Sequence, residues 1–465
     1  MTSTSAGSAA PQPECDLILK GGIASGVVFP SAVAELARHY RFRSVGGTSA
    51  GAIAAVVAAA AEYGRRRSMP KGSASASPAY SGFDRIDGLA AELGQAVNGR
   101  SRIVSLFQPS KAVAPLFRIA LGLQSSAPSG TAGRGGWPWY VKLTSAVFTE
   151  FCVVWIVGLV IATVVAAWLL ARPIWIPADL VGAAAAWIGL GIVIPLVVTI
   201  ARLAWLVVKA LPEIRYGMCS GTRQPDGKTD GLIEWMHGLV QEVAGRPPTR
   251  PLTFGQLWTL GESETAASTT AKRQIELVLI TSNLTQGLSH RLPFIEKSGR
   301  QPLYFCKSEL MELLPADVVD WMVEHPNGDK LPIPQDRGEE LHRLPAPADL
   351  PVVFGARISL SFPILLQAVP LYMVARPGTA VVRCWFSDGG ITSNFPIHLF
   401  DSPLPSRPTF CIDLAPRQTA GRSTPSLWKR PTRRLLRPGS TCRCRQGMRK
   451  GTGPASIASM TPGRH

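Results

Sequence analysis

The stretch Phe42-Arg43-Ser44-Val45-Gly46-Gly47-Thr48-Ser49-Ala50-Gly51 decides the fold of this chain. Its first four residues favour a β-strand, and the alanine-rich run at residues 52–61 favours a helix. Glycines two residues on either side of Ser49 let the strand and the helix approach each other while the hydroxyl stays exposed. The sequence therefore predicts a nucleophile elbow, a turn that presents Ser49 for acyl transfer.

A glycine-rich loop is predicted closer to the N-terminus. Residues 16–20 favour a buried strand, and they lead into Gly21-Gly22-Ile23-Ala24-Ser25-Gly26, which is followed by a helix-compatible run at residues 27–36. Glycines at a strand-to-helix junction expose backbone N–H groups at the N-terminus of the helix, where the helix dipole also favours negative charge. Such a loop is suited to hold an oxyanion.

A third segment places a carboxylate at the end of a strand. Residues 381–386 favour a strand, and Ser387-Asp388-Gly389-Gly390 follows it. A side chain at the carboxyl end of a strand lies at the crevice where open α/β sheets bind their ligands. An Asx turn that closes the strand is the structural alternative for this tetrapeptide. Beside a predicted serine nucleophile, Asp388 is the candidate for a general base.

Together these segments make the chain resemble the patatin-like phospholipases, in the branch whose first motif is K-G-G-x-x-S-G-V-V-x-P. That motif spans residues 20–30 here, and the resemblance extends over about residues 15–414. It also includes residues 281–287, which follow a predicted strand, and residues 356–363, which are similar to the family's helix before the aspartate strand.

The resemblance implies a three-layer α/β sandwich around a central, mostly parallel sheet, and a Ser-Asp dyad in place of a triad. Asp388 would accept the proton of Ser49 as Ser49 attacks an ester carbonyl, and would then activate water against the acyl-enzyme. The N–H groups of Gly21, Gly22 and Ala50 would bind the oxyanion. The motif glycines would be Gly26, Gly47, Gly51, Gly389 and Gly390.

A histidine is the alternative base. His398 follows Asp388 within the predicted domain, in the order Ser, Asp, His of the hydrolases that carry a nucleophile elbow. A histidine on the surface of a helix or loop explains this position at least as well, so we favour the dyad.

Two long apolar runs lie between the predicted nucleophile and the predicted base. Residues 151–171 and 180–201 carry no charged side chain, and each run is long enough to cross a hydrocarbon core at about 1.5 Å per residue. The turn between them, residues 172–179, contains two prolines. We therefore expect a transmembrane helical hairpin. A pair of buried core helices is the alternative, which fits less well because the family's core helices are shorter and amphipathic.

Charged and aromatic residues predict how the hairpin is oriented. Tryptophans suited to the membrane interface are Trp155, Trp168, Trp175, Trp187 and Trp205. Basic residues outside the hairpin are Arg134, Lys142, Arg202, Lys209 and Arg215, against Arg172 in the turn. The positive-inside rule then places both halves of the catalytic domain in the cytoplasm. Glu150 is expected at the interface rather than within the membrane.

The remaining sequence defines the ends of the domain. We expect a disordered N-terminus at residues 1–14, the first part of the patatin-like domain at 15–145, the transmembrane hairpin at 146–209, the second part at 210–415 and a basic tail at 416–465. Of the formal net charge of +17, the tail contributes twelve Lys or Arg and no acid. It would be attracted to anionic lipids and would bind nucleic acid only without specificity. A disordered extension or a frame-shifted end is the alternative.

The predicted function is that of a membrane-anchored serine acyl-hydrolase, of the phospholipase A kind, whose partners are a phospholipid or other lipid ester and the bilayer. The eight cysteines show no paired metal spacing, so no metal or other cofactor is expected. A patatin-fold membrane interaction protein with weak or no catalysis is one alternative, favoured by Ile23 and Ser25, which replace the loop's third glycine and its usual basic residue. A lipid acyltransferase, which the same dyad would support, is the other.

Overall fold

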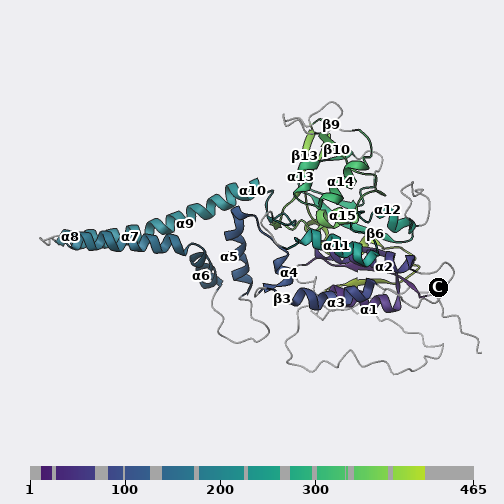
Figure 1. The fold of residues 1–465 in the computed structure, drawn as a ribbon, viewed down its shortest axis with the longest axis horizontal. Helices are drawn as coiled ribbons and strands as arrows, with labels where there is room; N and C mark the ends of the chain where they lie inside the picture. Colours follow the sequence, from purple (N-terminus) through teal and green to yellow (C-terminus); the bar gives the residue numbers. More distant parts are fainter. Residues whose placement is uncertain are drawn as a thin grey trace, which may run out of the picture.

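The computed structural model describes residues 12–22, 28–68, 82–97, 100–125, 139–171, 177–224, 229–261, 273–295, 301–329, 331–332, 340–374 and 381–413. Gly26, the turn at residues 172–176 and the predicted basic tail lie outside this part of the chain. The described residues form an α/β domain from which a long helical arm projects (Figure 1).

A ten-stranded sheet lies at the centre of the domain, in the order β14-β1-β2-β6-β13-β12-β8-β10-β9, with β7 paired to β6. Its strands are β1 (Glu14–Leu19), β2 (Arg41–Gly47), β6 (Glu276–Asn283), β7 (Leu288–Leu292), β8 (Leu303–Cys306), β9 (Leu331–Pro332), β10 (Glu340–Arg343), β12 (Val369–Val374), β13 (Val381–Asp388) and β14 (Thr409–Ile412). Strands β14, β1, β2 and β6 are parallel, and the remaining pairs are antiparallel. The predicted α/β fold with a central sheet is confirmed, and parallel pairing holds for the strands that carry the glycine loop and the elbow.

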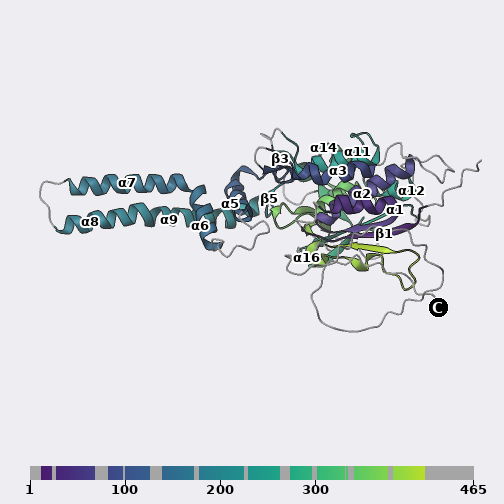
Figure 2. The same cartoon turned by 90° about the horizontal axis from the view of Figure 1, so that it is seen from below.

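Helix α2 (Ala50–Arg67) is the central helix against this sheet. It contacts β1, β2 and β6 on one side and α3 (Gly82–Gly94), α11 (Leu232–Ala244) and α15 (Val352–Ser359) around the rest. Residues Ala58 to Ala61 are fully buried, so the alanine-rich sequence lets neighbouring elements pack closely all round the helix. Figure 2 shows α1 (Phe29–His39), α2, α3 and α11 on the same side of β1.

Shorter elements complete the domain. The remaining helices on it are α4 (Arg102–Ser105), η2 (Lys111–Val113), α5 (Ala114–Ser125), α12 (Phe254–Thr259), α13 (Lys307–Met311), α14 (Ala316–Glu324), α16 (Gly390–Ser393) and η5 (Ile397–Leu399). Two small sheets are made by β3 (Ala96–Val97) with β4 (Arg100–Ser101), and by β5 (Gly217–Cys219) with β11 (Ile364–Leu366). The β5–β11 pair joins the foot of the helical arm to the segment that precedes β12.

The arm is a helical hairpin. Helix α6 (Trp139–Glu150) leads into α7 (Cys152–Leu170), and the returning helix consists of α8 (Pro177–Ile188), η3 (Gly189–Val193), α9 (Ile194–Trp205), η4 (Leu206–Ala210) and α10 (Leu211–Glu213). Figures 1 and 2 show α7 alongside α8 and α9, away from the sheet. The two sides touch through small residues: a Cβ on Gly158 would collide with the Pro195 ring, and one on Gly191 would lie 3.2 Å from the Cβ of Ala162.

The returning side of the arm is long and apolar enough to cross a membrane. The continuous helix Val181–Glu213 has 33 residues; its most apolar 18-residue window has a mean hydropathy of 2.3, and only 18% of that window is buried. Helix α7 meets the same test only together with the end of α6, from which it is bent by 73°. The expectation of an apolar, membrane-compatible helix is confirmed for one helix of the described residues, and the two-span topology stays a prediction.

Candidate active site

Ser49 occupies the turn between β2 and α2, as predicted. Its backbone has φ 56° and ψ −130°, a conformation that residues other than glycine rarely adopt. A Cβ on Gly51 would lie 2.8 Å from the carbonyl carbon of Leu19 and from the oxygen of Lys20. A Cβ on Gly47 would lie 2.6 Å from the carbonyl carbon of Gly51. The turn therefore requires glycine at both positions.

Strand register brings Asp388 to the level of Ser49. Gly47 at the end of β2 pairs with Leu279 of β6, and Thr281, two residues further along β6, pairs with Asp388 of β13. Asp388 is the last residue of β13 and so lies at the carboxyl end of a strand, as predicted, but β13 runs antiparallel to β6. It arrives from the opposite direction and meets the elbow because β6 and β13 extend beyond the end of β2.

The backbone of Asp388 is fixed by hydrogen bonds from two sides. Its N–H donates to the carbonyl of Ser361 at 3.0 Å, and its own carbonyl accepts the Ser282 hydroxyl at 2.8 Å. The next residue, Gly389, donates its N–H to Ser359 at 3.1 Å. A Cβ at Gly389 would collide with the carbonyl of Ile280. Two serines, Ser359 at the end of α15 and Ser361 just after it, therefore hold the aspartate in place.

The carboxyl group of Asp388 is buried, with 3% of the residue exposed. Burial raises the pKa of Asp388 from 3.8 to about 6, and this effect exceeds the lowering by the Ser49 side chain and by the Gly390 N–H. The Gly390 N–H donates to Oδ2 at 3.1 Å. Oδ1 forms no well-aligned hydrogen bond in the described residues. Ser49 is thus within interaction range of a carboxylate that retains acceptor capacity, and catalytic hydrogen bonds often align only when substrate is bound.

The predicted oxyanion donors differ in their availability. The Gly21 N–H already donates to the Asn394 carbonyl at 2.9 Å. The Gly21 N–H is therefore engaged in this conformation, and its role as an oxyanion donor stays a prediction. Within the described residues, the N–H groups of Gly22 and Ala50 have no acceptor, and the Ala50 N–H belongs to the first turn of α2. These two groups remain suited to bind an oxyanion.

Asn394 was not singled out as a site residue by sequence reasoning. Its carbonyl also accepts the Thr48 hydroxyl at 3.0 Å, so it ties the glycine loop to the elbow. A Cβ on Gly21 would lie 3.0 Å from the Cβ of Ser49, which places this loop directly against the nucleophile. The only signal for Asn394 in the sequence was its position six residues after Asp388.

His398 does not take part in the site. It is exposed on η5 and forms no hydrogen bond to Asp388 in the part of the chain that the structure describes. The same residues contain no group of three side chains suited to hold a metal ion.

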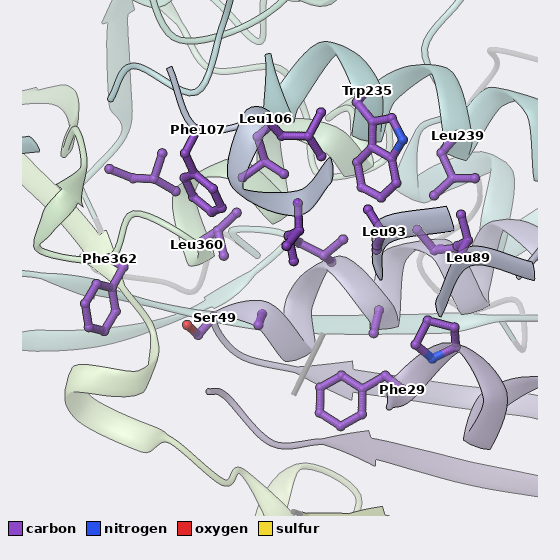
Figure 3. Close-up of a pocket in the computed structure, with 18 of the residues that line it drawn as sticks. Phe29, Ser49, Leu89, Leu93, Leu106, Phe107, Trp235, Leu239, Leu360 and Phe362 are labelled. Carbon is purple, nitrogen blue, oxygen red and sulfur yellow. The ribbon is translucent and has the colours of Figure 1, made fainter. Parts of the chain in front are cut away.

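An apolar cavity of about 110 Å³ opens beside Ser49. Figure 3 shows its lining, with Phe362 at one end near Ser49, and Leu89 and Leu239 at the other. Among the described residues that line it, Ser49 is the only one with a hydroxyl or a charge. The other lining residues include Phe29, Ile53, Leu93, Leu106, Phe107 and Trp235. The cavity suits a hydrocarbon group attached to an ester whose carbonyl reaches Ser49.

Arg357 holds together the backbone segments next to the site. Its side chain is fully buried and donates to the Ser361 hydroxyl at 2.6 Å and to the carbonyls of Ser220 and Gln367 at 2.9 and 2.8 Å. Desolvation lowers the pKa of Arg357 to about 9, with a smaller contribution from Arg215, so the guanidinium stays charged at neutral pH. Sequence reasoning placed Arg357 in a motif without assigning this role.

Comparisons with known proteins give one clear relative. No protein-family profile matches the chain. The solved structure of VipD from Legionella pneumophila is 16% identical, with 84% of this chain and 48% of VipD covered, and its TM-score of 0.23 is too low to support an argument. The RpoH suppressor of Rhizobium meliloti (strain 1021) is 34% identical in an alignment 458 positions long, and the alignment covers 88% of this chain and 67% of that protein. The chain belongs to the same protein family as this RpoH suppressor.

Proposed function

We propose that the protein is a membrane-anchored serine acyl-hydrolase of lipid esters, of the patatin-like phospholipase kind, that works through a Ser49–Asp388 dyad. The observation that carries this proposal is the meeting of three features at one point: a strained serine elbow, a buried carboxylate within interaction range of it, and an apolar cavity that begins at the serine. Each feature also occurs in structural roles, but their combination is suited to acyl transfer.

In the proposed reaction, Asp388 takes the proton of the Ser49 hydroxyl as the serine oxygen attacks the ester carbonyl. The tetrahedral oxyanion is held by the N–H groups of Gly22 and Ala50, which lack acceptors in the described residues. Protonated Asp388 then gives its proton to the leaving alcohol. The ionised carboxylate next activates water, which releases the fatty acid and restores Ser49.

The helical arm supports membrane attachment. Its exposed large apolar residues include Val153, Ile156, Val160, Val164, Trp168, Val181, Ile192, Ile194, Val197, Ile200 and Val208. A water-soluble protein rarely exposes so many contiguous apolar side chains, whereas a lipid environment requires them. The close contacts at Gly158 and Gly191 are typical of helices that pack within a membrane. We propose that α7 and the returning helix both span the bilayer and that the domain lies on its cytoplasmic face.

The foot of the arm has the features of an interface. Arg118 of α5 pairs with Glu150, where α6 bends into α7, and its Nε donates to the carboxylate at 2.8 Å. On the returning side, the guanidinium of Arg202 lies 4.4 Å from the ring centroid of Trp205. Paired charges and arginine–tryptophan contacts are common at the level of lipid head groups.

The proposal is tested with the full-length protein reconstituted into phosphatidylcholine and phosphatidylglycerol vesicles. Fatty acid release is measured for wild type, Ser49→Ala and Asp388→Asn, with His398→Ala as a matched control. We expect release from wild type and His398→Ala, and loss in both dyad variants. A fluorophosphonate probe should label wild type and leave Ser49→Ala unlabelled. Release that survives Asp388→Asn unchanged would remove Asp388 from the mechanism, and a folded wild type without labelling would refute the hydrolase.

A further inference from the structure

A strip of exposed apolar side chains connects the foot of the helical arm to the mouth of the Ser49 cavity. We call it the access strip and define it as Tyr216, Phe362, Pro363 and Ile364. Tyr216 is 52% exposed, Phe362 37% and Ile364 60%, and Pro363 is also exposed. Phe362 lines the cavity and lies near Ser49 in Figure 3.

Hydrogen bonds fix the strip against the arm. The Tyr216 N–H donates to the carbonyl of Leu211 in α10 at 2.8 Å, and the Ile364 N–H donates to the carbonyl of Tyr216 at 3.1 Å. Ile364 pairs with Gly217 where β11 meets β5. A continuous backbone connection therefore leads from the end of the apolar helix to Ile364, whose neighbour Leu365 lines the cavity.

Backbone strain at the strip favours a functional role. Tyr216 has φ 59° and Ile364 has φ 70°. A β-branched residue in this region of the backbone map is a rare outlier, and such strain is usually retained where function requires it. Glycine or asparagine would occupy either position with less strain. The side chains of Tyr216 and Ile364 are largely exposed, so the packing of the core does not explain why apolar residues occur there.

The surroundings of the strip suit a lipid head-group region. Tyr216 contacts Trp385 edge to face, with ring centroids 6.0 Å apart, and the guanidinium of Arg383 lies 4.3 Å from the centroid of the same tryptophan. Tyrosine, tryptophan and arginine side chains with one apolar and one polar part are favoured at membrane interfaces.

We propose that the access strip lies in the surface of the bilayer and guides an acyl chain of a membrane lipid directly into the Ser49 cavity. This inference rests on the proposed function and deepens it, because it makes a lipid resident in the same membrane, rather than a dissolved ester, the preferred substrate. Phe362 occupies the end of this route and forms part of the cavity, whereas Tyr216 and Ile364 lie outside the cavity lining and would meet the lipid before it enters.

The test uses a double variant, Tyr216→Asn with Ile364→Asn, in the full-length protein reconstituted into phosphatidylcholine and phosphatidylglycerol vesicles. Asparagine tolerates the left-handed backbone, so the fold should be kept or made more stable. We expect fatty acid release from the vesicle lipids to fall about tenfold or more, because two apolar side chains no longer enter the lipid. Hydrolysis of a short-chain, water-soluble ester by the same sample should stay within about twofold of wild type, because the dyad and the cavity are unchanged.

Leu404→Asn is the matched control, since Leu404 is 85% exposed and lies in the loop before β14. It should change neither activity. Equal fatty acid release from the double variant and wild type overturns the access strip, as does a parallel loss of both activities, which would show a disturbed site. A wild type that hydrolyses neither the vesicle lipid nor the soluble ester refutes the proposed function itself.

Discussion

Replacing Asp388 with asparagine should make the protein inactive and, at neutral pH, more stable. The carboxyl group is buried and its pKa is raised from 3.8 to about 6, chiefly by desolvation. Ionisation is therefore harder in the folded protein than in the unfolded chain. Asparagine has nearly the same shape and carries no charge, so it removes this cost together with the general base.

The size and the sign of this change in stability follow from the difference in the Asp388 pKa between the folded and the unfolded state. A pKa shift of about two units corresponds to about 3 kcal/mol at 1.36 kcal/mol per unit, and with 3% of the residue exposed there is little solvent screening to reduce it. Below pH 3.8 the carboxyl is neutral in both the folded and the unfolded state, so its burial does not lower the stability of wild type. Between pH 3.8 and about 6 the unfolded chain ionises while the folded protein does not, so the stability of wild type falls as the pH rises. Above about pH 6 the carboxyl is ionised in both states, and wild type has lost the full amount, about 3 kcal/mol of stability.

The assay is thermal unfolding of wild type and Asp388→Asn in the same detergent between pH 4 and pH 8. The Tm of the variant should exceed that of wild type by a few degrees at pH 8, and the difference should shrink towards zero at pH 4. Asp401→Asn, at an exposed carboxylate, should show no such trend. A difference that is constant with pH, or a variant less stable at pH 8, would refute the burial of an ionised base in this site.

Further substitutions test other parts of the structure. The value of kcat/KM should fall about tenfold per pH unit below the Asp388 pKa of about 6 and level off above it, because only the ionised carboxylate accepts the serine proton; a flat profile from pH 4.5 to 8 would contradict this role. Gly51→Ala should lose probe labelling and about 1–3 kcal/mol of stability through overlap with the end of β1, whereas Gly88→Ala, which has open space, should not. Arg357→Met should cost about 2–5 kcal/mol by leaving the carbonyls of Ser220 and Gln367 unpaired; exposed Arg38→Met is its control in the same unfolding assay. Gly158→Ala should lower the Tm of the arm because its Cβ meets Pro195, and Gly182→Ala should leave it unchanged.

The sequence predicted the parts of the site that depend on local backbone geometry. The elbow at Ser49 was predictable because glycines at fixed positions are needed for a strand and a helix to meet at a tight turn. The apolar helix at Val181–Glu213 was predictable because a long uncharged run has few other structural uses. The contact of Ser49 with Asp388 was inferred from family resemblance, and strand register provides its physical cause.

Features that depend on long-range packing were not predictable. The antiparallel direction of β13 is set by its pairing with β6 and β12, which nothing local to residues 381–388 encodes. The engagement of the Gly21 N–H by Asn394 and the hydrogen bond from Arg357 to the Ser220 carbonyl join segments far apart in the chain. The cavity lining likewise comes from several helices and loops, so no single stretch of sequence contains its pattern.

The unsatisfied groups of the site favour an enzyme over a binding protein that merely keeps the fold. The site retains a strained serine, a buried carboxylate with a raised pKa, and two N–H groups without acceptors in the described residues. The strained backbone of Ser49 lowers the stability of the folded state by about 1–3 kcal/mol, and burial of the Asp388 carboxylate lowers it further at neutral pH. A protein that only needed the fold would gain stability by replacing Ser49 with glycine and Asp388 with asparagine. An ester undergoing attack by Ser49 uses these groups together, since its oxyanion accepts both N–H groups and the attack moves the serine proton to the carboxylate.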